Sequence, residues 1–263
     1  MGIGQTCSTP SIPVQLTCTE YRSIIPSVFA GGESTSCHKE NVAVVTDLQR
    51  LHAVERAIST IIGQFERFPD LFYRESDLHS GFCRLLQSAP LLAEVYLTRD
   101  GRHTGLIHRE YPAFFSCDNP PDLGISGRFD VAVLAPGFVR GHCLEVVANL
   151  EGRAAESWRD LDPQDRPVPL LAAIHLKLLS SFEPPVLERL EADFYELVRS
   201  ENDAQRLYMA LLCNHWDLDG QIRRAMPVFE YWTARHTQVS LIVVQSHYDR
   251  VGHVFGGRYF NIW

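Results

Sequence analysis

The sequence has no long hydrophobic run, no closely paired cysteines and no excess of basic charge. No stretch approaches the roughly 20 apolar residues that span a bilayer, so we expect no membrane segment. The seven cysteines include no CxxC pair, which argues against a structural zinc site or a disulfide framework. The formal net charge of −8 argues against a protein that coats nucleic acid through bulk positive charge, although an acidic metal site remains compatible with it.

Three regions differ in composition. The first residues show no basic segment followed by an apolar run, so no secretory signal is visible and the cytoplasm is the expected compartment. Residues 1–40 are rich in Ser, Thr, Pro, Gly and Cys and predict an irregular N-terminal extension. Residues 41–263 are long enough for one domain with a large apolar core. Within this domain, residues 149–168 carry many charges and prolines and predict an exposed insertion.

The hydrophobic spacing of the domain predicts an α/β fold. Helices are predicted where apolar residues recur every three or four positions, at Val45–Phe65, Glu75–Gln87, Val186–Arg199 and Leu218–Arg235. Strands are predicted at Leu92–Thr98, Thr104–Tyr111, Gly127–Leu134, His142–Ala148, Leu170–Leu179, Leu207–Cys213 and Val239–Gln245. Asp100-Gly101 between the first two strands is typical of a hairpin turn. Because strands and helices alternate in the C-terminal half, we expect a layered sheet with helical crossovers there.

Four polar residues lie in apolar surroundings and are candidates for chemistry. Asp130 lies inside an apolar strand, where an unpaired carboxylate is costly. His175 and Lys177 are two positions apart in another apolar strand, so their side chains share one face of it. Glu75 opens an amphipathic helix. Gathered at one edge of a sheet, these groups are suited to holding a divalent metal and orienting a water molecule.

Each of these residues also has a simpler explanation. Glu75 is favoured in the first turn of a helix by the helix dipole. Asp130 is explained by an ion pair with Arg128, and Lys177 by an aliphatic stem that brings its charge to the strand end. A single His175 on an apolar strand is more often a hydrogen-bonded core residue than a metal ligand. The order of the residues therefore carries more weight than any one of them.

That order resembles the PD-(D/E)xK nuclease-like superfamily. An acid that opens a helix is followed by a hairpin that ends at Arg109–Pro112, and then by a strand that begins with Gly127–Asp130. Next comes an apolar strand that carries Lys177 and a polar residue two positions before it, and a helix and a strand follow. The resemblance covers roughly Glu75 to Ser246. It implies a restriction-endonuclease-like fold, in which helices flank a mixed central sheet.

The resemblance further implies a metal-dependent nuclease that hydrolyses phosphodiester bonds in DNA or RNA. Asp130, Glu75 and the residue at position 175 would hold Mg²⁺ or Mn²⁺, and Lys177 would position or activate the water. The family has Glu or Asp two residues before the lysine, whereas this chain has His175. A neutral imidazole brings no negative charge and suits Mg²⁺ less well than Mn²⁺ or Zn²⁺, so we expect weaker metal binding and reduced activity.

Two alternatives follow from that histidine. Glu145 lies in the apolar segment Cys143–Ala148 and is a replacement metal carboxylate if this segment is a strand beside Asp130, although Val147 then stands where the lysine is expected. The other alternative is a member of the family that has lost activity and binds nucleic acid or a protein partner.

The sequence also offers an interface for a homodimer. The helix Val45–Phe65 and the C-terminal aromatic residues Tyr259, Phe260 and Trp263 are apolar enough to join two copies, although core packing explains them equally well.

Overall fold

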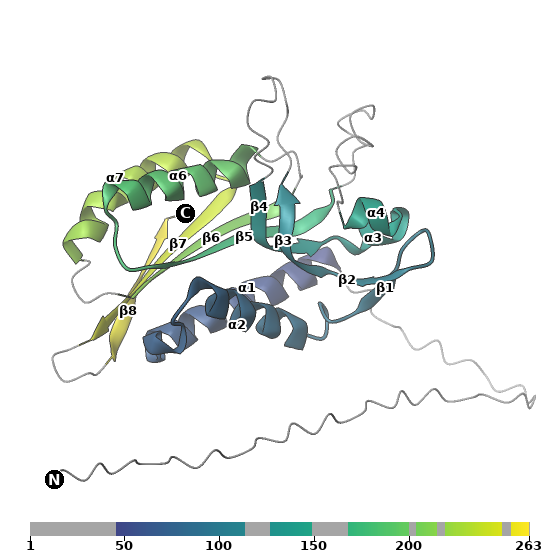
Figure 1. The fold of residues 1–263 in the computed structure, drawn as a ribbon, viewed down its shortest axis with the longest axis horizontal. Helices are drawn as coiled ribbons and strands as arrows, with labels where there is room; N and C mark the ends of the chain where they lie inside the picture. Colours follow the sequence, from purple (N-terminus) through teal and green to yellow (C-terminus); the bar gives the residue numbers. More distant parts are fainter. Residues whose placement is uncertain are drawn as a thin grey trace, which may run out of the picture. The chain divides into compact units, whose positions relative to one another are not determined.

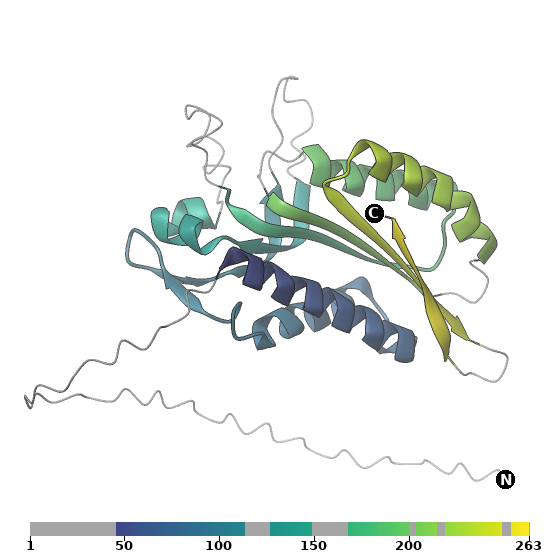
Figure 2. The ribbon, with the colours of Figure 1, turned by 180° about the vertical axis from the view of Figure 1, so that it is seen from behind.

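The computed structural model describes residues 46–113, 127–148, 168–199, 204–214, 219–248 and 254–262. All of them belong to one compact unit, Val44–Trp263. Helices cover both faces of a mixed sheet, which confirms the α/β class (Figures 1 and 2). None of the described helices has both the length and the apolar content needed to cross a bilayer. The extension 1–40 and nearly all of the insertion 149–168 lie outside the described residues, so their assignments stay predictions.

The central sheet has six strands, and neighbouring strands follow the chain order. They are β3 (Ile107–Ala113), β4 (Gly127–Leu134), β5 (Leu170–Leu179), β6 (Ala204–Cys213), β7 (Val239–Tyr248) and β8 (Val254–Ile262). The pairs β3–β4, β4–β5 and β7–β8 are antiparallel, whereas β5–β6 and β6–β7 are parallel. Parallel neighbours need a crossover, and α6 (Pro184–Arg199) and α7 (Asp219–Arg235) supply it, as the alternating pattern predicted.

A separate hairpin precedes the sheet. Its strands β1 (Val95–Leu97) and β2 (His103–Gly105) pair antiparallel, and Gly101 adopts φ +77° in the turn, which confirms the Asp-Gly prediction. The second predicted strand, Thr104–Tyr111, is divided in the structure. The fully buried Leu106 separates β2 from β3, because the chain bends there to pass from one sheet to the other.

Two helices cover one face of the sheet and two cover the other (Figures 1 and 2). The helices α1 (Asp47–Arg67) and α2 (Glu75–Ser88) lie on one face, joined through the short 3₁₀ helix η1 (Pro69–Leu71), and α6 and α7 lie on the opposite face. Helix α1 begins at a capping box, in which the Thr46 hydroxyl accepts from the Gln49 backbone N–H at 3.3 Å.

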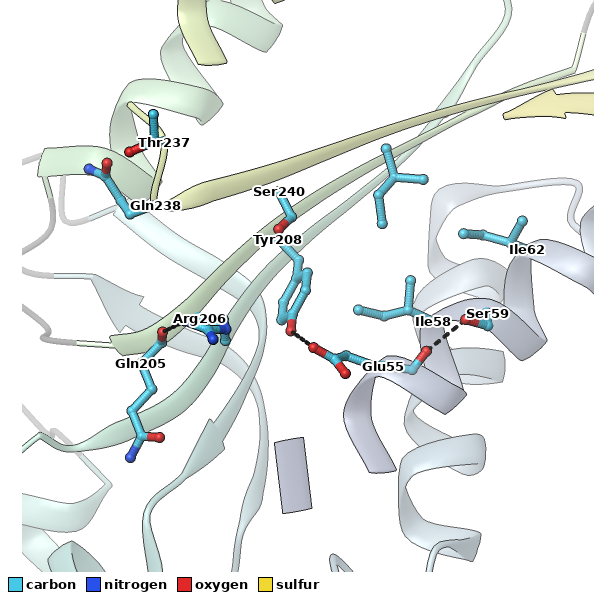
Figure 3. Close-up of a pocket in the computed structure, with 11 residues that line it drawn as sticks. Glu55, Ile58, Ser59, Ile62, Gln205, Arg206, Tyr208, Thr237, Gln238 and Ser240 are labelled. Atoms are coloured by element: carbon cyan, nitrogen blue, oxygen red, sulfur yellow. Dashed lines mark hydrogen bonds between the residues drawn. The ribbon is translucent and has the colours of Figure 1, made fainter. Parts of the chain in front are cut away.

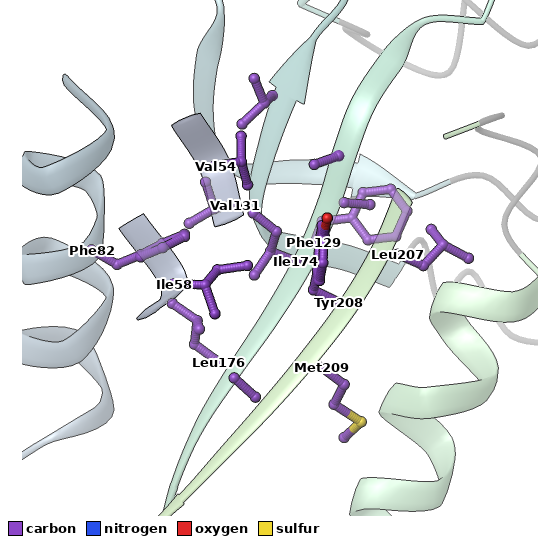
Figure 4. Packing of buried hydrophobic residues seen from close by; sticks show 14 of the residues in the cluster. Val54, Ile58, Phe82, Phe129, Val131, Ile174, Leu176, Leu207, Tyr208 and Met209 are labelled. Atoms are coloured by element: carbon purple, nitrogen blue, oxygen red, sulfur yellow. The ribbon is translucent and has the colours of Figure 1, made fainter. Parts of the chain in front are cut away.

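Buried apolar side chains hold these layers together. The first core lies between α1, α2 and the sheet, and Figure 4 shows among its members Val54, Ile58, Phe82, Val131, Ile174 and Leu176. On the other face, the rings of Phe194 from α6 and Trp232 from α7 stack with centroids 5.3 Å apart. Each fully buried side chain of this kind contributes about 1.5–3 kcal/mol of transfer free energy. The apolar stripe of α1 is used in this packing, so a dimer through that stripe stays without support.

The strand predicted at His142–Ala148 is wrong. The segment follows α3 (Pro136–Gly141) and contains the short helix α4 (Leu144–Val147). The run of apolar residues suggested a strand, but the Asp100 side chain accepts a hydrogen bond from the Leu144 backbone N–H at 3.0 Å and satisfies the start of a helix. This contact joins residues that are far apart in the sequence, so periodicity did not reveal it.

Candidate functional site

The candidate site lies where β4 and β5 stop pairing. The last register pair on this side joins Val131 to Ile174. Beyond it, the Leu176 backbone N–H donates to Asp130 Oδ2 at 2.8 Å, and His79 Nε2 donates to the Leu176 carbonyl oxygen at 3.0 Å. Two side chains therefore replace the missing strand bonds and satisfy backbone groups that are buried. The same bonds fix Asp130 and His79 beside each other.

Lys177 stands at the centre of three carboxylates. Its Nζ lies 3.2 Å from Asp193 Oδ2, 3.5 Å from Glu75 Oε1 and 3.7 Å from Asp130 Oδ2. These acids come from α6, α2 and β4, so Lys177 joins helices on opposite faces of the sheet (Figure 1). Burial alone would lower the pKa of Lys177, but the charges of Asp130, Asp193 and Glu75 outweigh it and raise the pKa above the ordinary value. The lysine is therefore charged at neutral pH.

Asp130 is also ionised despite its burial. Its side chain is 10% exposed, and burial would raise its pKa. The hydrogen bond from His175 and the electrostatic interactions with His175, Lys177 and His79 outweigh burial and hold the pKa of Asp130 below the ordinary value. His175 Nδ1 lies 3.3 Å from Asp130 Oδ2. Within the described part of the chain every contact of Asp130 uses Oδ2, which leaves Oδ1 available to a ligand.

Glu75 is positioned by the start of α2. It is the first residue of that helix, and the Arg74 backbone N–H donates to the Asp77 carboxylate at 3.1 Å, which closes the helix start. His79 follows one turn later, and its Nε2 lies 3.8 Å from Glu75 Oε1. Glu75 is 40% exposed, so the site opens to solvent on the side of this residue.

The donor atoms of Glu75, His79 and Asp130 fit one divalent ion. One ligand atom from each lies within 4.8 Å of the other two. Two carboxylates suit Mg²⁺ or Mn²⁺, and an imidazole shifts the preference towards Mn²⁺ or Zn²⁺. His79 Nε2 donates to Leu176 in this structure, so ligation through that nitrogen requires the hydrogen bond to break. The two carboxylates are the firmer part of the donor set.

The four residues predicted from the sequence, Glu75, Asp130, His175 and Lys177, come together in the structure. His175 contacts Asp130 but is 2% exposed, and within the described residues the group that fits an ion contains His79 in its place. The simpler pairing of Asp130 with Arg128 does not occur, because the described ion pairs of Asp130 are with Lys177 and the two histidines.

Glu145 does not belong to this site. It is an exposed residue of α4, and within the described residues it is not part of the group that fits an ion. Its expected place beside Asp130 depended on the strand predicted at His142–Ala148, which the structure replaces with a helix.

Sequence reasoning missed two residues of the site. His79 lies four positions after Glu75, and this spacing puts two side chains on one face of a helix, so the signal was present. Asp193 gives no such signal. It reaches Lys177 because Phe194 and its buried neighbours anchor α6 to the sheet, and this packing is a long-range property of the fold.

The site opens into two adjoining clefts. One, of about 290 Å³, is lined by residues that include Tyr73, Arg74 and Glu75. The other, of about 390 Å³, is lined by residues that include Glu75, Lys177 and Arg189. Both clefts share Glu75 and the end of β5, so they are continuous. The carboxylates of Glu75 and Asp193 line this continuous cleft.

A different hollow, of about 620 Å³, lies between α1 and the strands β6 and β7 (Figure 3). Its side chains are mainly neutral and include Ile58 and Ile62, and Tyr208 donates to Glu55 Oε1 at 3.0 Å. The cluster of acids and lysine lines other clefts, so we place the candidate site there and not in this hollow.

Comparison with known proteins adds no family assignment. No protein-family model matches the chain, and no curated protein or solved structure matches it significantly. Membership of the PD-(D/E)xK superfamily therefore stays a prediction, and the functional argument depends on the geometry of the site.

Proposed function

We propose that the protein is a divalent-metal-dependent nuclease that hydrolyses phosphodiester bonds in DNA or RNA, on a restriction-endonuclease-like fold of the PD-(D/E)xK type. One observation carries the proposal: the amine of Lys177 in β5 lies within 3.7 Å of the carboxylates of Glu75 in α2 and Asp130 in β4. Glu75 and the half-buried Lys177 line a solvent-open cleft, and the buried Asp130 lies beside them. These three residues match those that the resemblance assigns to metal binding and water activation.

The residues of the site have distinct roles in this proposal. Glu75 and Asp130, with His79, would hold Mg²⁺ or Mn²⁺. The bound ion supplies polarisation of the phosphate and a lower pKa for a coordinated water. Lys177 donates hydrogen bonds to the negative charge that develops on the phosphate. His175 holds the Asp130 carboxylate in place through its hydrogen bond.

Asp193 supplies a negative charge in place of the Glu or Asp that the family has at position 175. Its Oδ2 lies 3.2 Å from Lys177 Nζ, closer than either of the other acids. It therefore keeps the amine charged and oriented, and it restores the negative charge of the site. The acid comes from the helix after β5 instead of from β5 itself.

A second candidate function is binding of nucleic acid or a protein partner without cleavage. The observation that favours it is the position of His79, whose Nε2 lies within 4 Å of oxygens of Leu176, Asp130 and Glu75. The nitrogen donates to the Leu176 carbonyl oxygen and lies against both carboxylates, so it occupies the space beside the oxygens that an ion would bind. The ammonium of Lys177 competes for the same carboxylates.

Thermal unfolding with divalent ions separates the two candidates. We expect Mn²⁺ at 100 times its Kd to stabilise the wild type by about 2.7 kcal/mol, and Mg²⁺ at the same concentration to stabilise it less, because it should bind more weakly. Asp130→Asn should abolish this effect, whereas Glu145→Gln, which changes an exposed carboxylate away from the site, should leave it intact. Absence of stabilisation by any divalent ion would support the binding function. Cleavage of plasmid or RNA that Lys177→Ala leaves unchanged would refute the proposed mechanism.

A further inference from the structure

The segment between α1 and α2 exposes aromatic side chains beside the candidate site. Tyr73 is 84% exposed and Phe68 is 64% exposed. Exposed rings of this size lose the stabilisation that burial provides, and clusters of them typically mark binding surfaces. Tyr73 is two residues from Glu75 and lines the same cleft of about 290 Å³. The ring is therefore placed to contact a molecule that reaches the carboxylates.

Tyr73 also lines a larger hollow, of about 660 Å³. That hollow includes Arg84 of α2. Three hollows thus follow one another. The first, of about 660 Å³, shares Tyr73 with the second, of about 290 Å³. The second shares Glu75 with the third, of about 390 Å³. We call this succession the site groove. Glu75 lies where the second hollow meets the third, and Lys177 lines the third.

Each hollow of the site groove contains an exposed arginine. Arg84 lines the first, Arg74 the second and Arg189 the third. Four acids also line the groove, namely Asp70, Glu75, Asp77 and Asp193. Lys177 lies beside Glu75 and Asp193, and the Asp77 carboxylate accepts a hydrogen bond from the Arg74 backbone N–H at the helix start. Guanidinium groups that line successive hollows, with an exposed ring where two of the hollows meet, complement a chain of phosphates that carries flat bases.

We propose that the site groove binds single-stranded nucleic acid, with a base stacked on Tyr73 and phosphates held by Arg74 and Arg189. This inference rests on the proposed nuclease function and adds the substrate class. In a duplex, the faces of the bases are covered by their neighbours, so a protruding tyrosine finds no face to stack on. An unpaired base presents that face, and stacking tolerates any base.

Fluorescence anisotropy with labelled oligonucleotides of one sequence, as single-stranded DNA, single-stranded RNA and duplex DNA, tests the proposal. The full-length protein is used without added metal, so that cleavage does not affect the readout. We expect a single strand to bind more tightly than the duplex. Tyr73→Ala should weaken single-strand binding by about tenfold, and Tyr73→Phe, which keeps the ring, should retain most of it.

Tyr231 provides the matched control. It is an exposed tyrosine of α7, on the opposite face of the sheet, and the Arg235 guanidinium lies 4.3 Å from its ring centroid. Tyr231→Ala should leave binding unchanged. Equal loss in Tyr231→Ala and Tyr73→Ala would overturn the proposal, as would equal affinity for duplex and single strand or no binding of any oligonucleotide.

The two proposals fail in different ways. Single-strand binding that depends on Tyr73, in a protein that cleaves nothing with Mn²⁺, would support the groove and refute the nuclease function. Duplex cleavage that requires Lys177 and is indifferent to Tyr73 would support the nuclease function and refute the groove.

Discussion

Replacing Lys177 with methionine is the most informative single perturbation of the site. The change removes one positive charge and leaves three carboxylates whose oxygens lie 3.2–3.7 Å from the lost amine. Breaking a buried ion pair typically costs about 3–5 kcal/mol. Glu75 is 40% exposed and Asp193 is 29% exposed, so solvent screens part of the repulsion. We therefore expect the metal-free variant to lose roughly 2 kcal/mol of unfolding free energy at neutral pH.

The pH dependence of this loss has a defined sign. The pKa of Lys177 is raised in the folded protein, so its stabilisation is present below about 10.4 and is lost as the pH rises through the folded value. The pKa of Asp130 is lowered, so its stabilisation is present above about 3.9 and is lost as the pH falls through the folded value. The difference between wild type and Lys177→Met should therefore be largest at neutral pH and shrink in acid and in strong alkali.

The same variant should bind Mn²⁺ more tightly. Two unit charges at about 4 Å repel by about 1 kcal/mol even at the dielectric constant of water, which gives about 2 kcal/mol for a divalent ion against the ammonium. Loss of that repulsion corresponds to a Kd more than tenfold lower. Lys177→Arg keeps the charge and should keep the weaker binding.

Calorimetric titration and urea unfolding, each with and without Mn²⁺, measure both effects. An unchanged Mn²⁺ affinity together with unchanged stability would show that the amine and the carboxylates are not coupled, and the account of the site would be refuted.

Three further predictions concern the surroundings of the site. Gly127→Ala places a methyl group 2.1 Å from the present position of Glu196 Oε1, so that carboxylate must move, and we expect a loss of about 1 kcal/mol in urea unfolding. Phe194→Ala removes a fully buried ring that stacks on Trp232, and should cost about 3–5 kcal/mol by the same measurement. The pKa of Lys177, followed by NMR after reductive methylation, should lie above the ordinary value of about 10.4.

The strands that carry the site could be predicted because their signals are local. Gly127–Leu134 and Leu170–Leu179 have the predicted bounds in the structure, since each is an apolar run bounded by turn or proline residues. The last strand, Val254–Ile262, was missed because Gly256 and Gly257 interrupt its apolar pattern. The helix at Leu144–Val147 was missed because a distant side chain caps it.

The residues of the candidate site also fall into two groups, those that local sequence signals predict and those that only the fold brings to the site. Asp130 and Lys177 could be predicted, because a charge inside an apolar strand is costly unless a partner compensates it, and such residues stand out in the sequence. That each is the partner of the other follows only from the register of β4 and β5. Asp193 could not be predicted, since its role depends on the face of the sheet that α6 covers and on its rotation there.

The charge of the site explains how a histidine can occupy position 175. A carboxylate there would lie beside Asp130 at a position that is 2% exposed, and two buried acids in contact repel each other unless a cation lies between them. An imidazole instead donates a hydrogen bond to Asp130 and needs no ion to be stable. Asp193 then supplies negative charge from a position that is 29% exposed, where solvation reduces the cost of ionisation. The fold thereby keeps three acids around one lysine. In the proposed function the ammonium would compete with the ion for these carboxylates, so we expect ion binding to be weak and reversible.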